Sequence, residues 1–236
     1  MNIEEYRKIY NSDDADPGWE AIDKALKKIY KKQKPKHWAP EIYGSLGGPD
    51  PLDGISVYKS NAGGIEHYHF VTYGFSELYY SEEAVEEGCS KFEFELTFRL
   101  KPFELDKEYP TWPLNLLQNL ARYVFESYRH FEEFHMMNAN GPIRLETDTD
   151  ITALAFCIDP ELGIIDTPHG KVEFVQIYGI TNEEYQSLKE NGTDSKPIFD
   201  SIKASNPLFI TDLTRKSQNK TSKGATKSKP KKKQKS

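Results

Sequence analysis

Two histidines that could bind a metal lie in the segment Glu66-His67-Tyr68-His69. In an extended strand, residues two apart point to the same face, so His67 and His69 could approach one ion together. Nothing at metal-ligand spacing completes the set, because the other histidines are scattered: His37, His130, His135 and His169. A structural or surface histidine pair is therefore the favoured interpretation, and we expect neither a metal nor a cofactor.

Nucleophilic catalysis has little support in the residues. The chain contains no G-x-S-x-G elbow, no phosphate-binding loop and no G-x-G-x-x-G turn. Cys157 and His169 could form a dyad on paper, but Cys157 lies in the apolar run ITALAFCI, where a cysteine usually packs. Cys89 falls in an expected loop, and no C-x-x-C pair suggests a redox or zinc motif. We expect no catalytic residues and a protein that is not an enzyme.

Charge is distributed unevenly along the chain. Of 31 Lys and Arg residues, ten lie in residues 215–236, which hold no Asp or Glu, so residues 1–214 carry 21 basic and 37 acidic side chains, a net formal charge of -16. The 215–236 tail has almost no apolar residues, and we expect it to be disordered. Nucleic acid could be bound only through this tail, by phosphate neutralisation without base stacking. Lys229–Lys233 also resembles a nuclear import signal, if the source is a eukaryote.

A strand and a helix follow one another in residues 92–127. Apolar and polar side chains alternate from Phe92 to Leu100, which predicts a strand with one apolar and one charged face. Thr111-Trp112-Pro113 then marks a helix start, and apolar residues continue at helical spacing to about Ser127. The end of this helix and the segment after it are rich in residue types typical of protein interfaces, namely Tyr123, Phe131, Phe134, His135, Met136 and Met137.

The other expected elements indicate an α+β fold. Helices are predicted at 19–32, from Thr181 and from Pro197, and strands at 55–59, 66–73, 151–158, 172–178 and 208–212. Strands and helices mix without a βαβ rhythm, so we expect one domain with a mixed or antiparallel β-sheet flanked by helices. The domain is assigned to residues 19–214, after an N-terminal arm of residues 1–18 that is loose or forms a short helix. No apolar run suits a membrane span, and a cytoplasmic protein is expected.

Several segments, in order along the chain, resemble the suppressor-of-fused domain family. They are LGGPDPLD at 46–53, EHYHFVTYGFSEL at 66–78, FELTFRL at 94–100, TWP and LARYVF within 111–125, TPHGKVEFVQIYG at 167–179 and LFITDL at 208–213. The resemblance covers roughly residues 19–214, and the chain looks like a single-domain, bacterial-type member. It also argues against a metal at the histidine pair, because the family is not known for one there.

The resemblance implies a peptide-binding site. Animal members hold a transcription factor by a short segment that adds as a strand between two lobes, and their first lobe resembles this chain. Tyr123 matches a tyrosine of that groove and Phe131 matches a nearby aromatic residue. The groove's acidic residue has no clear counterpart among Glu133, Phe134 and His135, and the second lobe has no match in this sequence.

These features give three functional hypotheses. Short stand-alone members resemble immunity proteins that neutralise toxins, often nucleases, and the charge of residues 1–214 would attract a basic partner. A non-enzymatic, toxin-neutralising binder is therefore the first hypothesis. The alternative is a regulatory adaptor that sequesters a transcription factor, and a second alternative is nucleic-acid binding through the tail. The oligomeric state and the binding face stay open.

Overall fold

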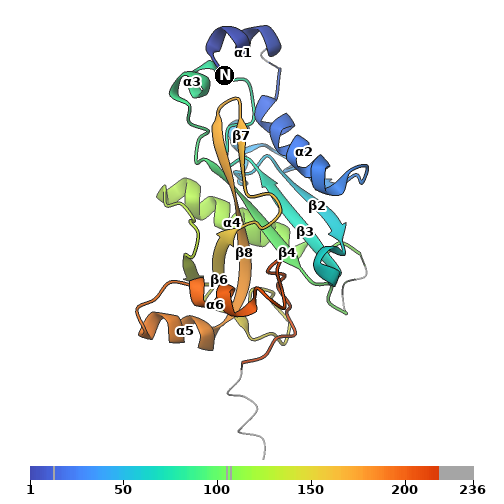
Figure 1. The fold of residues 1–236 in the computed structure, drawn as a ribbon, viewed down its shortest axis with the longest axis vertical. Helices are drawn as coiled ribbons and strands as arrows, with labels where there is room; N and C mark the ends of the chain where they lie inside the picture. The colour runs from blue at the N-terminus through green and yellow to red at the C-terminus, as the bar shows by residue number, and fades with distance from the viewer. Residues whose placement is uncertain (13, 105, 107, 218–236) are drawn as a thin grey trace, which may run out of the picture.

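A single mixed β-sheet organises the chain in the computed structural model, which describes residues 1–12, 14–104, 106 and 108–217 (Figure 1). The strands of this part of the chain are β1 (Lys36–Trp38), β2 (Gly54–Ser60), β3 (His67–Tyr73), β4 (Phe94–Leu100), β5 (Met136–Asn138), β6 (Ile151–Ile158), β7 (Ile164–Thr167) and β8 (Gly170–Thr181). Their order is β1-β2-β3-β4-β8-β6-β5, and β7 pairs with β8. Only the β4–β8 pairing is parallel among these strands, so the sheet is mixed.

Helices cover both faces of the sheet. They are α1 (Ile3–Ile9), α2 (Pro17–Tyr30), α3 (Glu82–Glu87), α4 (Trp112–Ser127), α5 (Asn182–Glu190) and α6 (Lys196–Ile202), with 3-10 turns η1 (Gly44–Leu46) and η2 (Ala62–Gly64). α4 packs on one face, while α2 covers one part of the other face and α5 and α6 cover another part (Figure 1). The predicted α+β fold with a flanked mixed sheet is confirmed.

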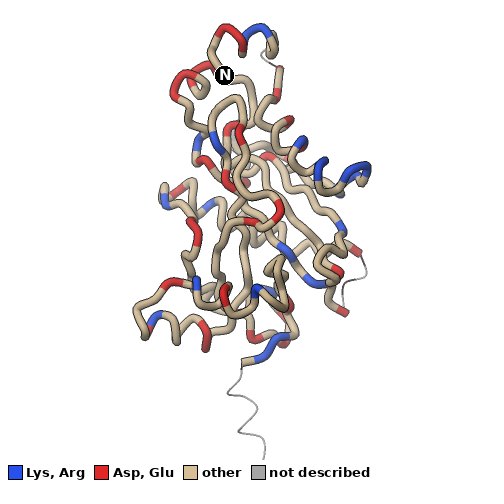
Figure 2. Tube along the Cα trace, in the orientation of Figure 1, with Lys and Arg blue, Asp and Glu red and all other residues tan. Residues whose placement is uncertain are grey.

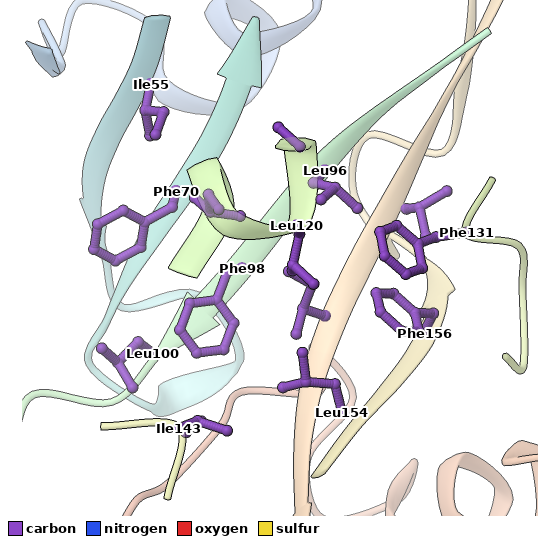
Figure 3. Packing of buried hydrophobic residues seen from close by; sticks show 14 of the residues in the cluster. Ile55, Phe70, Leu96, Phe98, Leu100, Leu120, Phe131, Ile143, Leu154 and Phe156 are labelled. Atoms are coloured by element: carbon purple, nitrogen blue, oxygen red, sulfur yellow. The ribbon is translucent and has the colours of Figure 1, made fainter. Parts of the chain in front are cut away.

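The main core lies between α4 and the central strands. Leu96, Phe98 and Leu100 of β4 point to α4, and apolar residues of α4 such as Leu120 pack against them, as Figure 3 shows. The alternation in β4 sets this face because side chains two residues apart share one side of a strand. Leu96, Phe98 and Leu100 are all completely buried.

The polar face predicted for β4 is present on the side opposite α4, and it is buried. Glu95, Thr97 and Arg99 point to that face, and all three are completely buried. The reason is that the face is covered: α2 brings Tyr30 over it, and a segment after α6 brings the carbonyl groups of Leu208 and Phe209 to the neighbouring Gln176. These polar groups are tolerated because each has hydrogen-bond partners on that face. Glu95 accepts from the hydroxyls of Thr72 and Ser76, Thr97 donates to Asp159, and Arg99 donates to Gln176 and Asp159.

Most predicted elements are present, with one clear exception. The strand predicted at 208–212 does not form, and only an isolated bridge joins Leu100 to Thr211. Phe209 has a left-handed φ of 49°, which breaks the extended run. The helix predicted from Thr181 begins as expected, because the Thr181 hydroxyl accepts from the Glu184 amide and the Glu184 carboxylate accepts from the Thr181 amide.

The two terminal segments differ in what the structure describes. Residues 1–18 hold the short helix α1 and the start of α2, and Tyr6 of α1 is completely buried. Arg215 and Lys216, which the sequence assigned to a disordered tail, instead bind the domain through ion pairs with Glu184 and Asp148. The rest of that tail, from residue 218, lies outside the described residues. No helix in the described part is long and apolar enough to cross a membrane.

Candidate functional site

The end of α4 and the loop after it build a small groove at one edge of the sheet. α4 ends at Ser127. The next residue, Tyr128, has a left-handed φ of 56° that turns the chain back, and its amide donates to the Val124 carbonyl. The reversal brings Phe131 beneath Tyr123, with ring centroids 5.9 Å apart. Phe131 in turn stacks on Phe156 of β6 at 4.4 Å and an interplanar angle of 12°, as Figure 3 shows.

This stack forms the floor and wall of a groove of about 430 Å³. Its lining is Tyr123, Arg129, His130, Phe131, His135, Met136, Met137 and Phe156. Phe131 is only 6% exposed, whereas Tyr123 is 37% exposed, so a buried aromatic floor meets a wall that is accessible to a ligand. An apolar concavity with a few polar groups at its rim is the usual form of a site for a peptide side chain.

The residues predicted for the site divide between two places. Tyr123, Phe131 and His135 line the groove together, and Met136 and Met137 join them. Phe134 does not: its left-handed φ of 67° turns its ring to the opposite face, where it packs near Phe199 of α6. Glu133 is exposed and does not line the groove.

Polar groups at the groove come from Arg129, His130 and His135, and Glu132 contacts His135 from outside the lining. The Glu132 amide donates to Nδ1 of His135 at 3.2 Å, and the Glu132 carboxylate lies 3.6 Å from Nε2 of the same ring. The acidic group beside the groove is thus Glu132. Sequence reasoning missed this residue and the groove residue Phe156, which reads as ordinary core in ITALAFCI and reaches the groove only through strand pairing.

Strand β5 borders the groove and ends the sheet. It pairs with β6 on one side, with Met137 opposite Leu154, and no described strand pairs with its other side. An edge strand presents unpaired backbone N–H and C=O groups, which can bind an added strand. Met136 packs toward α5 and α6, and Met137 packs toward the α4 core. These two side chains hold β5 in place on both faces of the sheet.

The histidine pair is part of a buried polar network. The Arg99 guanidinium lies 3.0 Å from Oδ1 of Asp159, and its Nη1 lies 3.2 Å from Nε2 of His67. His69 Nε2 faces Oδ2 of Asp159 at 3.1 Å, and the Tyr30 hydroxyl lies 2.6 Å from Nδ1. Burial, reinforced by the charge of Arg99, lowers the pKa of His69 to about 4, so the ring is neutral at pH 7. Both rings are buried within this polar network, and no described group of three or more His, Cys, Asp or Glu is arranged to hold a metal.

The catalytic dyad considered from the sequence, Cys157 with His169, does not form. Cys157 is buried among the side chains under α5 and α6, and burial raises the pKa of its thiol. Both ring nitrogens of His169 are engaged elsewhere, with the Tyr6 hydroxyl at 2.9 Å and the Glu77 carbonyl at 3.1 Å.

With this geometry in place, comparison with known proteins decides the family. The sequence profile described as suppressor of fused protein matches residues 48–216. The chain belongs to the suppressor-of-fused family. A human relative, suppressor of fused homolog, is 37% identical over 180 residues, which make up 72% of this chain and 37% of the human protein. This chain therefore spans little more than a third of that relative's length.

Solved structures share this fold. A crystal structure described as the Sufu–Fu complex has a TM-score of 0.78 and 28% identity, covering 86% of this chain and 93% of that one. A putative suppressor-of-fused homolog from Neisseria gonorrhoeae has a TM-score of 0.54 and 16% identity, covering 85% and 96%, and shows likeness of fold alone. The animal relatives are the more similar in sequence, and bacterial-type membership is not established.

Proposed function

We propose that this chain is a non-catalytic adaptor that holds a regulatory protein, such as a transcription regulator, by a short extended segment. The observation that carries the proposal is the apolar groove next to the open edge of β5. The segment would pair its backbone with β5, as in other cases of strand addition, and place one apolar side chain against Tyr123 and Phe131.

The comparisons favour the adaptor over the toxin-neutralising hypothesis. The human relative is a suppressor of fused homolog, and one structural neighbour is described as a complex of Sufu with Fu. The second description names a complex, which fits a protein-binding role, and neither description names a toxin. The net charge of -16 on residues 1–214 does not distinguish the hypotheses, because it would attract any basic partner.

The test is a quantitative pull-down from the native host with three full-length baits: the wild type, Tyr123→Ala and the matched control Tyr128→Ala. Tyr123 lines the groove, whereas Tyr128 is 76% exposed at the end of the same helix and does not line it. We expect a regulatory protein bound by the wild type and the control, and at least tenfold less of it on Tyr123→Ala.

Hydrogen exchange locates the contact. The amides of Met136 and Asn138 should exchange more slowly in the complex, because residues 135, 137 and 139 bond to β6 and only the alternate amides of β5 face outward to an added strand. Equal capture by all three baits, or no slowing of hydrogen exchange in β5, would refute the proposal that the partner binds at the groove. Capture of a toxin fragment in place of a regulator would instead support the hypothesis of a toxin-neutralising immunity protein.

A further inference from the structure

Residues 24–36 concentrate positive charge in a domain that is otherwise acidic. They read KALKKIYKKQKPK, with seven lysines and no acidic residue, whereas residues 1–214 together carry a net formal charge of -16. This second basic region is separate in sequence from the tail, and neither the groove nor the adaptor role uses it. Figure 2 shows the basic positions gathered along α2.

The fold presents these lysines on one continuous surface. Ile22, Leu26 and Tyr30 of α2 are buried in the domain, so the helix turns the opposite side to solvent. Lys24, Lys28, Lys31 and the other lysines of residues 24–36 are exposed, first on the last turns of α2 and then along the connection into the edge strand β1. We call the seven side chains the lysine surface: Lys24, Lys27, Lys28, Lys31, Lys32, Lys34 and Lys36.

Strand β2 adds one further lysine to this surface. Gln33, within the run, donates its side-chain amide to the Lys59 carbonyl at 3.1 Å and so joins the two segments. Lys59 is exposed and lies over the Tyr109 ring, 4.9 Å from its centroid. The basic region therefore extends beyond the helix onto the sheet edge.

The lysine surface is almost without ion-pair partners. Among the described residues only Lys27 has one, with its ammonium 4.0 Å from the carboxylate of Asp23. Like charges three and four residues apart destabilise a helix, and α2 holds such pairs at Lys24–Lys27 and Lys24–Lys28. The negative end of the helix dipole offsets this for lysines in the last turn of α2, but it does not reach Lys34 or Lys36.

We propose that the lysine surface binds nucleic acid through its phosphate backbone, without base-sequence preference. A row of lysines matches a row of phosphates, and neutralising phosphates is what drives such binding. No large apolar side chain is exposed within residues 17–38, so the region lacks the apolar contacts that amphipathic helices use to hold a lipid bilayer. At physiological salt, acidic residues farther than roughly 8 Å are screened, so the local lysines decide the contact.

The test measures the fluorescence anisotropy of a labelled DNA duplex of about 20 base pairs, and of oligo-dT of similar length, against the full chain at several salt concentrations. The surface variant is Lys24→Gln/Lys28→Gln/Lys32→Gln. The matched control is Lys171→Gln/Lys189→Gln/Lys203→Gln, which removes the same charge from three exposed lysines elsewhere. A third variant, Lys231→Gln/Lys232→Gln/Lys233→Gln, reports on the tail, and circular dichroism checks that each variant folds.

We expect micromolar binding by the wild type at low salt, an affinity at least tenfold weaker for the surface variant, and a change of less than twofold for the control. The slope of log affinity against log salt should be shallower by roughly 0.9 for each lysine removed, about 2 to 3 in all. Equal loss in the surface variant and the control, loss confined to the tail variant, or no binding by the wild type would overturn the proposal. So would binding to phosphatidylserine vesicles, but not to DNA, that depends on the same three lysines.

Discussion

Removing the buried arginine at the centre of the sheet should unfold the protein far more readily than removing an exposed one. Arg99 is completely buried, and its Nη2 atom lies 3.0 Å and 3.1 Å from the two carboxylate oxygens of Asp159. Its Nε atom donates to Gln176, and Nη1 lies 3.0 Å from the Glu161 carboxylate. Arg99→Met keeps the apolar stem and deletes every one of these contacts.

The magnitude follows from what is left behind. Burial on its own would raise the pKa of Asp159, but His69 and Arg99 hold it well below its usual value, so the carboxylate is charged. Without Arg99, that charge stays buried with one strong partner fewer. Removing one member of a buried pair costs about 3 to 5 kcal/mol. For a domain of this size, such a loss lowers the melting temperature by roughly 6 to 20 °C.

The assay is urea and thermal unfolding followed by tryptophan fluorescence, with Arg7→Met as the matched control. Arg7 also pairs with a carboxylate, that of Glu82, but its side chain is 56% exposed, so its loss should leave the transition almost unchanged. The double variant Arg99→Met/Asp159→Asn should be less destabilised than the two single changes add up to. The reasoning is refuted if Arg99→Met unfolds no more easily than Arg7→Met.

Three further predictions rest on single positions. Burial raises the pKa of Glu95 to about 6, although the hydrogen bonds that its carboxylate accepts lower it. Between about pH 4.5 and 6 the folded state therefore binds more protons than the unfolded state. The free energy of unfolding should fall by about 2 kcal/mol as the pH rises through that window. Glu95→Gln should remove this component, and equal urea midpoints for the wild type and the variant at both pH 4.5 and pH 7 would contradict it. A Cβ at Gly48 would lie 1.9 Å from the Ile42 carbonyl oxygen, so Gly48→Ala should lower the free energy of unfolding by about 1 to 3 kcal/mol. The control Gly141→Ala should change it little, because a Cβ there meets nothing within 4 Å. Similar urea midpoints for the two variants would count against the reasoning. Phe131→Ala should cost about 3 to 5 kcal/mol in chemical denaturation because its ring is buried in the groove floor, and a loss below 1 kcal/mol would mean that the floor is not packed as described.

The local pattern of the sequence determined the elements and the face that each turns to the core. The period-two alternation of Phe94–Leu100 predicted β4, and the proline-opened apolar repeat predicted α4. The capping box at Thr181 fixed the start of α5. These are interactions within a few residues, and the sequence displays them directly. The family segments could be found in the same way, because they are contiguous.

The tertiary structure decided what lies on the second face and at the edge. Alternation places Glu95 and Arg99 opposite the core, but only the packing of α2 and of the segment after α6 buries them. Phe156 reached the groove through the pairing of β6 with residues 134–138, and Phe134 left it through a left-handed turn. Such outcomes depend on contacts between residues far apart in the chain. A strand's period sets which side chains share a face, but it does not set what covers that face.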